Sequence, residues 1–114
     1  MMIDIDIERV QAEISSFYNK LCYIHFEMTS GAYAAYRQGH SASGYIRNAR
    51  VHLLEGKITG EGPFRVGLKT EDGWIYADGL TKKDEDGKGT LLLYGFDSEG
   101  KMQIALQLSD TPFQ

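Results

Sequence analysis

The sequence is poor in residues that cross-link or interrupt a chain, since its 114 residues include one cysteine and two prolines. The single thiol, Cys22, forms neither an intrachain disulfide nor the four-thiolate cage of a structural zinc site. No apolar run approaches the ~20 residues that span a bilayer, so we expect no membrane association. The acidic start, Met1–Asp6, lacks the basic and apolar regions of a secretory signal, and we therefore expect a cytoplasmic protein.

Positive charge is also scarce, with twelve Lys and Arg against sixteen Asp and Glu and a net charge of −4. This balance argues against general attraction to nucleic acid, and we expect no nucleic-acid partner. The charge is uneven along the chain. Residues 44–69 carry five basic and two acidic residues, whereas residues 70–114 carry nine acidic and four basic residues. This distribution predicts a dipolar surface.

The remaining composition, 42% hydrophobic and 25% charged, is that of a globular protein, and residues 1–114 are predicted to form one domain. One helix is predicted over about residues 6–20, where apolar residues recur at steps of three and four. Asp4 or Asp6 is expected to cap its start, and Lys20 suits its last turn.

From about residue 21 to residue 109 the apolar period changes to two, which is typical of half-buried strands. The predicted strands are Cys22–Thr29, Ala32–Tyr36, Tyr45–Leu54, Phe64–Thr70, Trp74–Asp78, Thr90–Phe96 and Met102–Leu108. Gly-containing segments separate most of them, including breaks at Glu55–Gly56 and Gly60–Pro63. The sequence therefore predicts a mainly β fold, an antiparallel distorted sandwich or barrel of about seven strands with one N-terminal α-helix.

Two catalytic motifs are incomplete. Residues 39–43 resemble a nucleophile elbow, but Ser43 stands where that motif requires glycine, and a polar loop is the better interpretation. Residues 62–70 resemble a phosphate-binding loop, but Leu68 separates the glycine from the lysine and the segment alternates like a strand. We therefore predict no catalytic residues, metal or cofactor.

His25 and Glu27 lie two residues apart on one predicted strand, so their side chains point to the same face. An acid/base pair or a metal site can begin in this way, with His40 or His52 as a third member. The alternative is a polar pair on a solvated sheet face. The histidine spacing matches no common metal motif.

A second group of candidate ligand-binding residues is basic and aromatic. Arg65 and Lys69 share one strand face, and Arg47 is expected to join them from a neighbouring strand. Such cations suit a phosphate or carboxylate, and Trp74 or Tyr76 suits stacking. The alternative is an ordinary exposed face, with the cations paired to acids across strands and the rings packed on the sheet.

Several segments resemble the YojF family of small Bacillus-type proteins. They are Gly31–Ala35, Tyr45–Arg50, Gly56–Thr70, Gly73–Leu80, Asp97–Gly100 and Thr111–Phe113. The likeness runs from about Tyr23 to Phe113. It implies a distorted β-sandwich, and it transfers no catalytic residue because the family has no established activity.

The resemblance also implies a partner, because members of this family tend to be encoded beside an LmbE-type zinc-dependent deacetylase related to bacillithiol biosynthesis. The first functional hypothesis is therefore a non-catalytic accessory or binding protein, a homodimer that contacts such a deacetylase. The second is a binding protein for an anionic small molecule, or a minor enzyme, that uses Arg47, Arg65, Lys69, Trp74 and Tyr76, with His25 and Glu27 as acid/base candidates.

Overall fold

The computed structural model describes residues 1–29 and 43–113. Its elements, in chain order, are β1 (Met2–Asp4), α1 (Ile7–Ser15), β2 (Lys20–Thr29), β3 (Ser43–Thr59), β4 (Phe64–Thr70), β5 (Trp74–Leu80), β6 (Lys82–Asp84), β7 (Leu91–Phe96) and β8 (Met102–Ser109). The predicted strand Ala32–Tyr36 and the polar loop that follows it lie outside the described residues.

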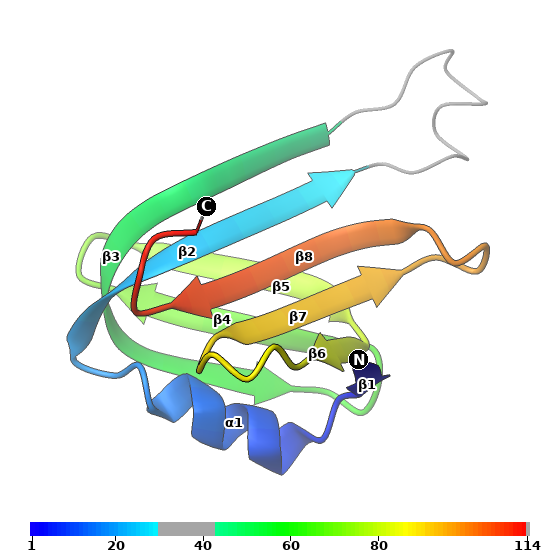
Figure 1. Ribbon diagram of the computed structural model, residues 1–114, viewed down its shortest axis with the longest axis horizontal. Helices are drawn as coiled ribbons and strands as arrows, with labels where there is room; N and C mark the ends of the chain where they lie inside the picture. The colour runs from blue at the N-terminus through cyan, green and yellow to red at the C-terminus, as the bar shows by residue number, and fades with distance from the viewer. Residues whose placement is uncertain (30–42, 114) are drawn as a thin grey trace.

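The eight strands form one sheet in the order β1-β6-β7-β8-β2-β3-β4-β5, and every pairing is antiparallel. The long strand β3 joins two parts of this sheet, because its first part pairs with β2 and its last part, from Leu53 to Thr59, pairs with β4. Figure 1 shows β3 curving so that β4 and β5 lie behind β7 and β8. We call β3-β4-β5 the back layer and the other strands, with the first part of β3, the front layer.

The core lies between these two layers. Its fully buried side chains come from both layers and from the helix, and they include Val10, Ile14, Ile24, Leu53, Val66, Leu68, Leu80, Leu91, Leu93, Leu106 and Leu108. The layers approach closely where β5 passes β7. A Cβ placed on Gly95 would lie 2.0 Å from the carbonyl oxygen of Gly79. The predicted mainly β, antiparallel class is therefore confirmed.

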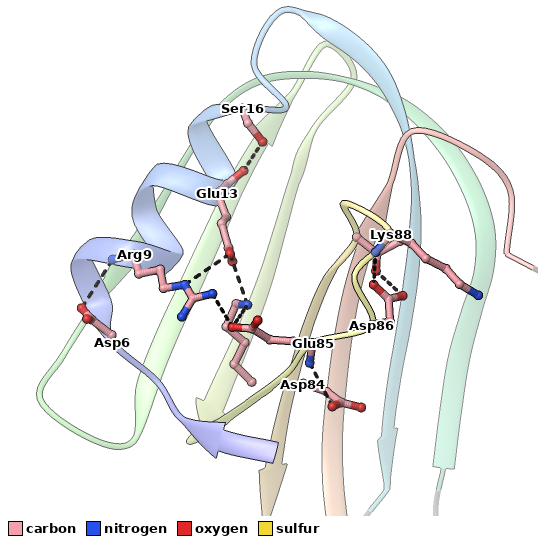
Figure 2. A network of polar contacts seen from close by, with 10 residues as sticks. Asp6, Arg9, Glu13, Ser16, Asp84, Glu85, Asp86 and Lys88 are labelled. Carbon is pink, nitrogen blue, oxygen red and sulfur yellow. Dashed lines mark hydrogen bonds and ion pairs between the residues drawn. The ribbon is translucent and has the colours of Figure 1, made fainter. Parts of the chain in front are cut away.

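Helix α1 lies along one side of the core, next to the last part of β3 (Figure 1), and its apolar side chains Val10 and Ile14 are buried there. Asp6 caps its start, because its carboxylate accepts hydrogen bonds from the backbone N–H groups of Glu8 and Arg9 (Figure 2). The helix ends at Ser15 rather than near residue 20. The apolar period continues to Phe17, but Lys20 already begins β2, so the prediction was too long at this end.

The predicted break at residues 55–56 is wrong, because β3 continues through Gly56 to Thr59. Gly56 serves close packing instead of a turn. A Cβ at this position would lie 2.7 Å from Leu68 Cδ2 and 2.8 Å from Ile14 Cγ2, so only glycine lets the helix reach the strand. Strands β1 and β6 were not predicted, because three residues are too few to show a period.

Candidate ligand-binding surface

The predicted site residues fall into two separate places. Arg65, Lys69, Trp74 and Tyr76 lie on β4 and β5 of the back layer, whereas His25, Glu27 and Arg47 lie on β2 and β3 of the front layer. The expected meeting of Arg47 with Arg65 and Lys69 is wrong. The part of β3 that pairs with β4 runs from Leu53 to Thr59, and Arg47 belongs to the part beside β2.

On the back layer, strand register brings the basic and aromatic residues onto the outer face. Lys69 pairs with Trp74, and Gly67 pairs with Tyr76 on one side and Lys57 on the other. Since alternate residues share a face, Arg65 and Lys69 flank Gly67 on the outside while Val66 and Leu68 enter the core.

The side chains on this face form a ladder of cation, ring, ring and cation. Lys69 Nζ lies 5.6 Å from the Trp74 ring centroid, and the Trp74 and Tyr76 rings stack with centroids 5.9 Å apart at 4°. Arg65 Cζ lies 5.0 Å from the Tyr76 ring. A Cβ on Gly67 would lie 2.9 Å from Tyr76 Cε1, so the missing side chain makes room for the ring. The rings are nevertheless half exposed, at 57% for Trp74 and 52% for Tyr76.

We call Lys57, Arg65, Lys69, Trp74 and Tyr76 the cation–aromatic surface. Its Arg65 lies 3.6 Å from the carboxylate of Asp78. In the part of the chain that the structure describes, neither Lys57 nor Lys69 lies within ion-pair distance of a carboxylate. Glu55 of β3 pairs across the strands with Lys69, so this face carries three basic and two acidic side chains, counting Asp78. The excess of positive charge around Gly67 favours an added anion.

Lys57 was not among the predicted site residues, although it lies on the strand beside Gly67. It was left out because the predicted strand ended at Leu54, before the break expected at residues 55–56. Once β3 is known to continue through that point, Lys57 and Thr59 alternate with buried Ile58, and the pairing with β4 places Lys57 beside Gly67. A longer strand prediction would have found it.

A groove of about 550 Å³ lies beside this surface, where Lys57 and Trp74 line it together with Glu55, Gln11 and Tyr18. The Gln11 side chain forms hydrogen bonds with the backbone at the edge of β3, where a neighbouring strand would otherwise pair. Its amide nitrogen donates to Gly56 O at 3.0 Å, and its amide oxygen accepts from the N–H of Ile58 at 3.0 Å. This edge of the back layer is therefore already satisfied.

The second place is the outer face of β2. His25 is buried, and its Nε2 lies 2.8 Å from Glu27 Oε1, while its Nδ1 has no hydrogen-bond partner among the described residues. Phe113 packs edge-on against the imidazole at 6.2 Å. Burial raises the pKa of nearby Tyr94, whose hydroxyl oxygen accepts from Gln107 Nε2. Of the predicted third members, His52 does not join the pair, because it instead contacts Glu71 at 3.2 Å. The other, His40, lies outside the described residues.

Glu27 also lines a cavity of about 300 Å³ together with Tyr45, Met28 and Met102. Within residues 1–29 and 43–113, no group of three or more His, Cys, Asp or Glu side chains is arranged to hold a metal ion. In the His25–Glu27 pair, the Glu27 carboxylate lies at the cavity wall, and the buried His25 imidazole orients it through their hydrogen bond.

Comparison with known proteins matches residues 4–113 to the family described as "Protein of unknown function (DUF1806)". The chain belongs to this family. It is 46% identical over 108 residues to the uncharacterized protein YojF of Bacillus subtilis (strain 168), covering 93% of each chain. It also resembles the crystal structure of B. subtilis YojF, with a TM-score of 0.83 and 43% identity over 99% of this chain and 97% of that one.

The expected likeness to YojF is thus confirmed, and the DUF1806 family is one of unknown function. None of the helices in the described part of this family member is long and apolar enough to cross a bilayer. The cytoplasmic location, the homodimer and the deacetylase partner stay predictions.

Proposed function

We propose that this DUF1806 protein is a non-catalytic binding protein that holds an anionic group on its cation–aromatic surface. One observation carries the proposal: among the described residues Lys57 and Lys69 flank Gly67 with no carboxylate within ion-pair distance, not even Glu55, which pairs across the strands with Lys69, and they lie beside two exposed stacked rings. Carboxylate and phosphate oxygens accept hydrogen bonds from such cations. The rings exclude water from one side of the charges, which strengthens this attraction.

The chain carries its own reporter for this proposal, because Trp74 is its single tryptophan and lies within the surface. We would titrate the protein with inorganic pyrophosphate and with citrate while measuring tryptophan fluorescence, and repeat the titration with sodium chloride at equal ionic strength. A saturable change with either anion, larger than the change that sodium chloride produces, is the expected result.

Paired variants test where the anion lies. The double variant Lys57→Gln and Lys69→Gln should weaken binding roughly tenfold, at about 0.7 kcal/mol for each lost charge contact. The control is Lys88→Gln with Lys101→Gln, which removes the same charge from exposed positions elsewhere and should bind as the unaltered protein does. The proposal is wrong if fluorescence changes only with ionic strength, or if both double variants weaken binding equally.

A finer form of this proposal names the partner. The resemblance to the YojF family implies an LmbE-type deacetylase linked to bacillithiol biosynthesis, and we propose that the binding protein acts as its accessory. Sedimentation velocity of the mixed proteins at tens of micromolar tests the contact, and the same experiment on the protein alone tests the predicted homodimer. Unchanged sedimentation of both components would exclude the direct contact.

A further inference from the structure

The groove beside the cation–aromatic surface lies over β3, between two aromatic rings. Glu55 and Lys57 of β3 line it together, and they point to the same face because they lie two residues apart. Trp74 of β5 lines it from the side on which β4 pairs with β3. Tyr18, which follows the helix, lines it from the other edge of β3, where its hydroxyl donates to Gly56 O. A methylene chain laid in this groove would therefore contact both rings, which removes apolar surface from water.

The polar side chains of the groove differ in whether they are already bonded. Gln11 is bonded to the backbone of β3 through both ends of its amide, and the Tyr18 hydroxyl is bonded to Gly56 O. By contrast, neither Glu55 nor Lys57 has a hydrogen-bond or ion-pair partner within the described ranges 1–29 and 43–113. The groove thus presents one negative and one positive charge that the fold does not use.

Lys69 does not neutralise Glu55, although the two residues pair across β4 and β3. Its Nζ lies over the Trp74 ring, 5.6 Å from the centroid, and Lys69 is not among the described residues that line the groove. An anion alone in the groove would be attracted by Lys57 and repelled by Glu55. A ligand that carries both charges would be attracted at both ends.

The spacing of the two charged residues sets the length of such a ligand. Alternate residues of a strand lie ~6.8 Å apart. An extended chain covers that length in two residues, or about six covalent bonds. The matching ligand therefore has about six bonds between its ammonium nitrogen and its carboxyl carbon, as an extended 6-aminohexanoate has.

We propose that this groove binds a zwitterion of the ω-amino acid class, with its ammonium group at Glu55 and its carboxylate at Lys57. The methylene chain lies between the rings of Trp74 and Tyr18, and the order of the two charges along β3 fixes its direction. The carboxylate half of the assignment rests on the proposed function of the cation–aromatic surface, and the ammonium half rests on Glu55.

The first experiment compares three probes with the same six-carbon chain: 6-aminohexanoate, hexanoate and hexylammonium. Each is titrated at constant ionic strength while the fluorescence of Trp74 is measured. We expect 6-aminohexanoate to bind saturably and at least roughly threefold more tightly than either singly charged probe, since each of those leaves one charge of the groove unpaired. The proposal is overturned if hexanoate or hexylammonium binds as tightly as 6-aminohexanoate.

Chain length tests the spacing. The shorter 4-aminobutanoate and the longer 8-aminooctanoate carry the same two charges and should both bind more weakly than 6-aminohexanoate. Affinity that rises steadily with chain length would report contact with the rings alone and would overturn the assignment of the two charges to Glu55 and Lys57.

Amide chemical shifts locate the ligand. The backbone of Gly56 and Gly67 lines the groove, so their amide signals and the indole N–H of Trp74 should move on addition of 6-aminohexanoate. The amide of Gly95, which lies at the contact between the layers, should not move. The largest shifts at any other part of the molecule would overturn the site.

Paired variants test the two charges separately. Glu55→Gln should weaken 6-aminohexanoate roughly threefold without weakening hexanoate, whereas Lys57→Gln should weaken both. The controls Glu61→Gln and Lys101→Gln remove the same charges from exposed positions outside the groove and should change neither affinity. All four positions are exposed, and unchanged urea denaturation would show that the variants are folded. If Glu55→Gln weakened both probes equally, or neither, the ammonium position would be wrong.

These measurements also separate the inference from the proposed function. If 6-aminohexanoate binds no more tightly than hexanoate while pyrophosphate still binds through Lys57 and Lys69, the zwitterion site fails and the anion-binding surface stands. If 6-aminohexanoate binds through Glu55 and Lys57 while pyrophosphate and citrate do not bind, the zwitterion site stands and the proposed binding of free anions fails.

Discussion

Two lysines of this protein show how differently its charges are used. Lys83 of β6 is 3% exposed, and its Nζ lies 3.2 Å from Glu13 of the helix and 3.2 Å from Glu85. Arg9 completes this cluster by pairing with Glu85 (Figure 2). Lys69 of β4 is exposed, and its ammonium group lies over the Trp74 ring. One lysine is held between two carboxylates, and the other is held over a ring.

The difference separates a cation that holds the fold together from a cation that is available to a ligand. A buried ammonium group is tolerated only when neighbouring charges replace its lost hydration, so Glu13 and Glu85 are required where they are. They also tie α1 to β6, on the side of the core that the helix covers. Lys69 keeps its water and stabilises little, but its charge remains available to a partner.

The same contrast is found in two glycines. Gly95 lies in the closed part of the molecule, beneath a backbone carbonyl of β5, and Gly67 lies on the open outer face beneath the Tyr76 ring. Backbone at a packed layer contact has nowhere to move, whereas an exposed ring can rotate away. We call the surroundings of Lys83 and Gly95 the closed region and the outer face around Lys69 and Gly67 the open region. Matched substitutions of the two lysines and of the two glycines test whether these regions differ in how much each residue stabilises the fold.

The lysine pair should give the largest difference. Lys83→Ala leaves Glu13 and Glu85 close together without their shared cation and removes buried methylene groups, so the free energy of unfolding should fall by about 3 kcal/mol. Lys69→Ala should change it by less than about 0.5 kcal/mol. Urea denaturation monitored by circular dichroism measures both. Equal losses from the two variants would contradict the division into closed and open regions.

The glycine pair should give the next largest difference. Gly95→Ala would place a methyl group 2.0 Å from Gly79 O and 2.8 Å from Ile104 Cγ2, and we expect a loss of about 2–3 kcal/mol. Gly67→Ala would meet Tyr76 Cε1 at 2.9 Å, and rotation of the ring should limit the loss to about 1 kcal/mol or less.

A fluorescence measurement adds an independent check on the same pair. The displaced Tyr76 ring in Gly67→Ala should change the emission of Trp74, on which it stacks. Gly95→Ala leaves that stack untouched and should show native emission at low urea. If Gly67→Ala were the more destabilising variant, the outer face would be as tightly packed as the core.

These contrasts also show how much the sequence reveals. Strand β4 was predicted with its observed bounds, because its alternation and the flanking glycines are local signals. Local alternation likewise placed Arg65 and Lys69 on one face. The same reasoning was wrong at Gly56, where glycine signals close packing between distant segments and not a turn. A glycine beneath another element looks like a turn glycine until the packing is known.

The closed region was the least predictable from sequence. Lys83 stands in a charged segment that resembles a solvated loop, and its burial depends on a helix far away in the chain that supplies Glu13. Pairings at such distances leave no trace in the local pattern. The prediction that Arg47 joins Arg65 and Lys69 was wrong for the same reason. The sequence does not show which part of a long strand pairs with which neighbouring strand.

The last predicted stability effect concerns Cys22, which lies inside the front layer. Burial raises the pKa of its thiol from 9.0 to about 11, with Asp110 adding to the rise and Lys20 opposing it. The unfolded chain therefore loses this proton above about pH 9, while the folded chain keeps it up to about pH 11. The thiol thus makes the free energy of unfolding fall with rising pH across this window, by roughly 1 kcal/mol at pH 10. Cys22→Ala should lack this contribution, so the two denaturation series should converge as the pH rises from 9 to 11.

Thiol labelling relates this prediction to the comparison of closed and open regions. Cys22 should resist a thiol-specific reagent at pH 8 in the folded protein and react after unfolding in urea, because both burial and a raised pKa suppress the thiolate. Lys69→Cys in a Cys22→Ala background places the one thiol of the chain on the cation–aromatic surface instead, where it should react promptly without urea. Rapid labelling of Cys22 in the folded protein would show that the layers separate readily, and the closed region would then be closed only on average.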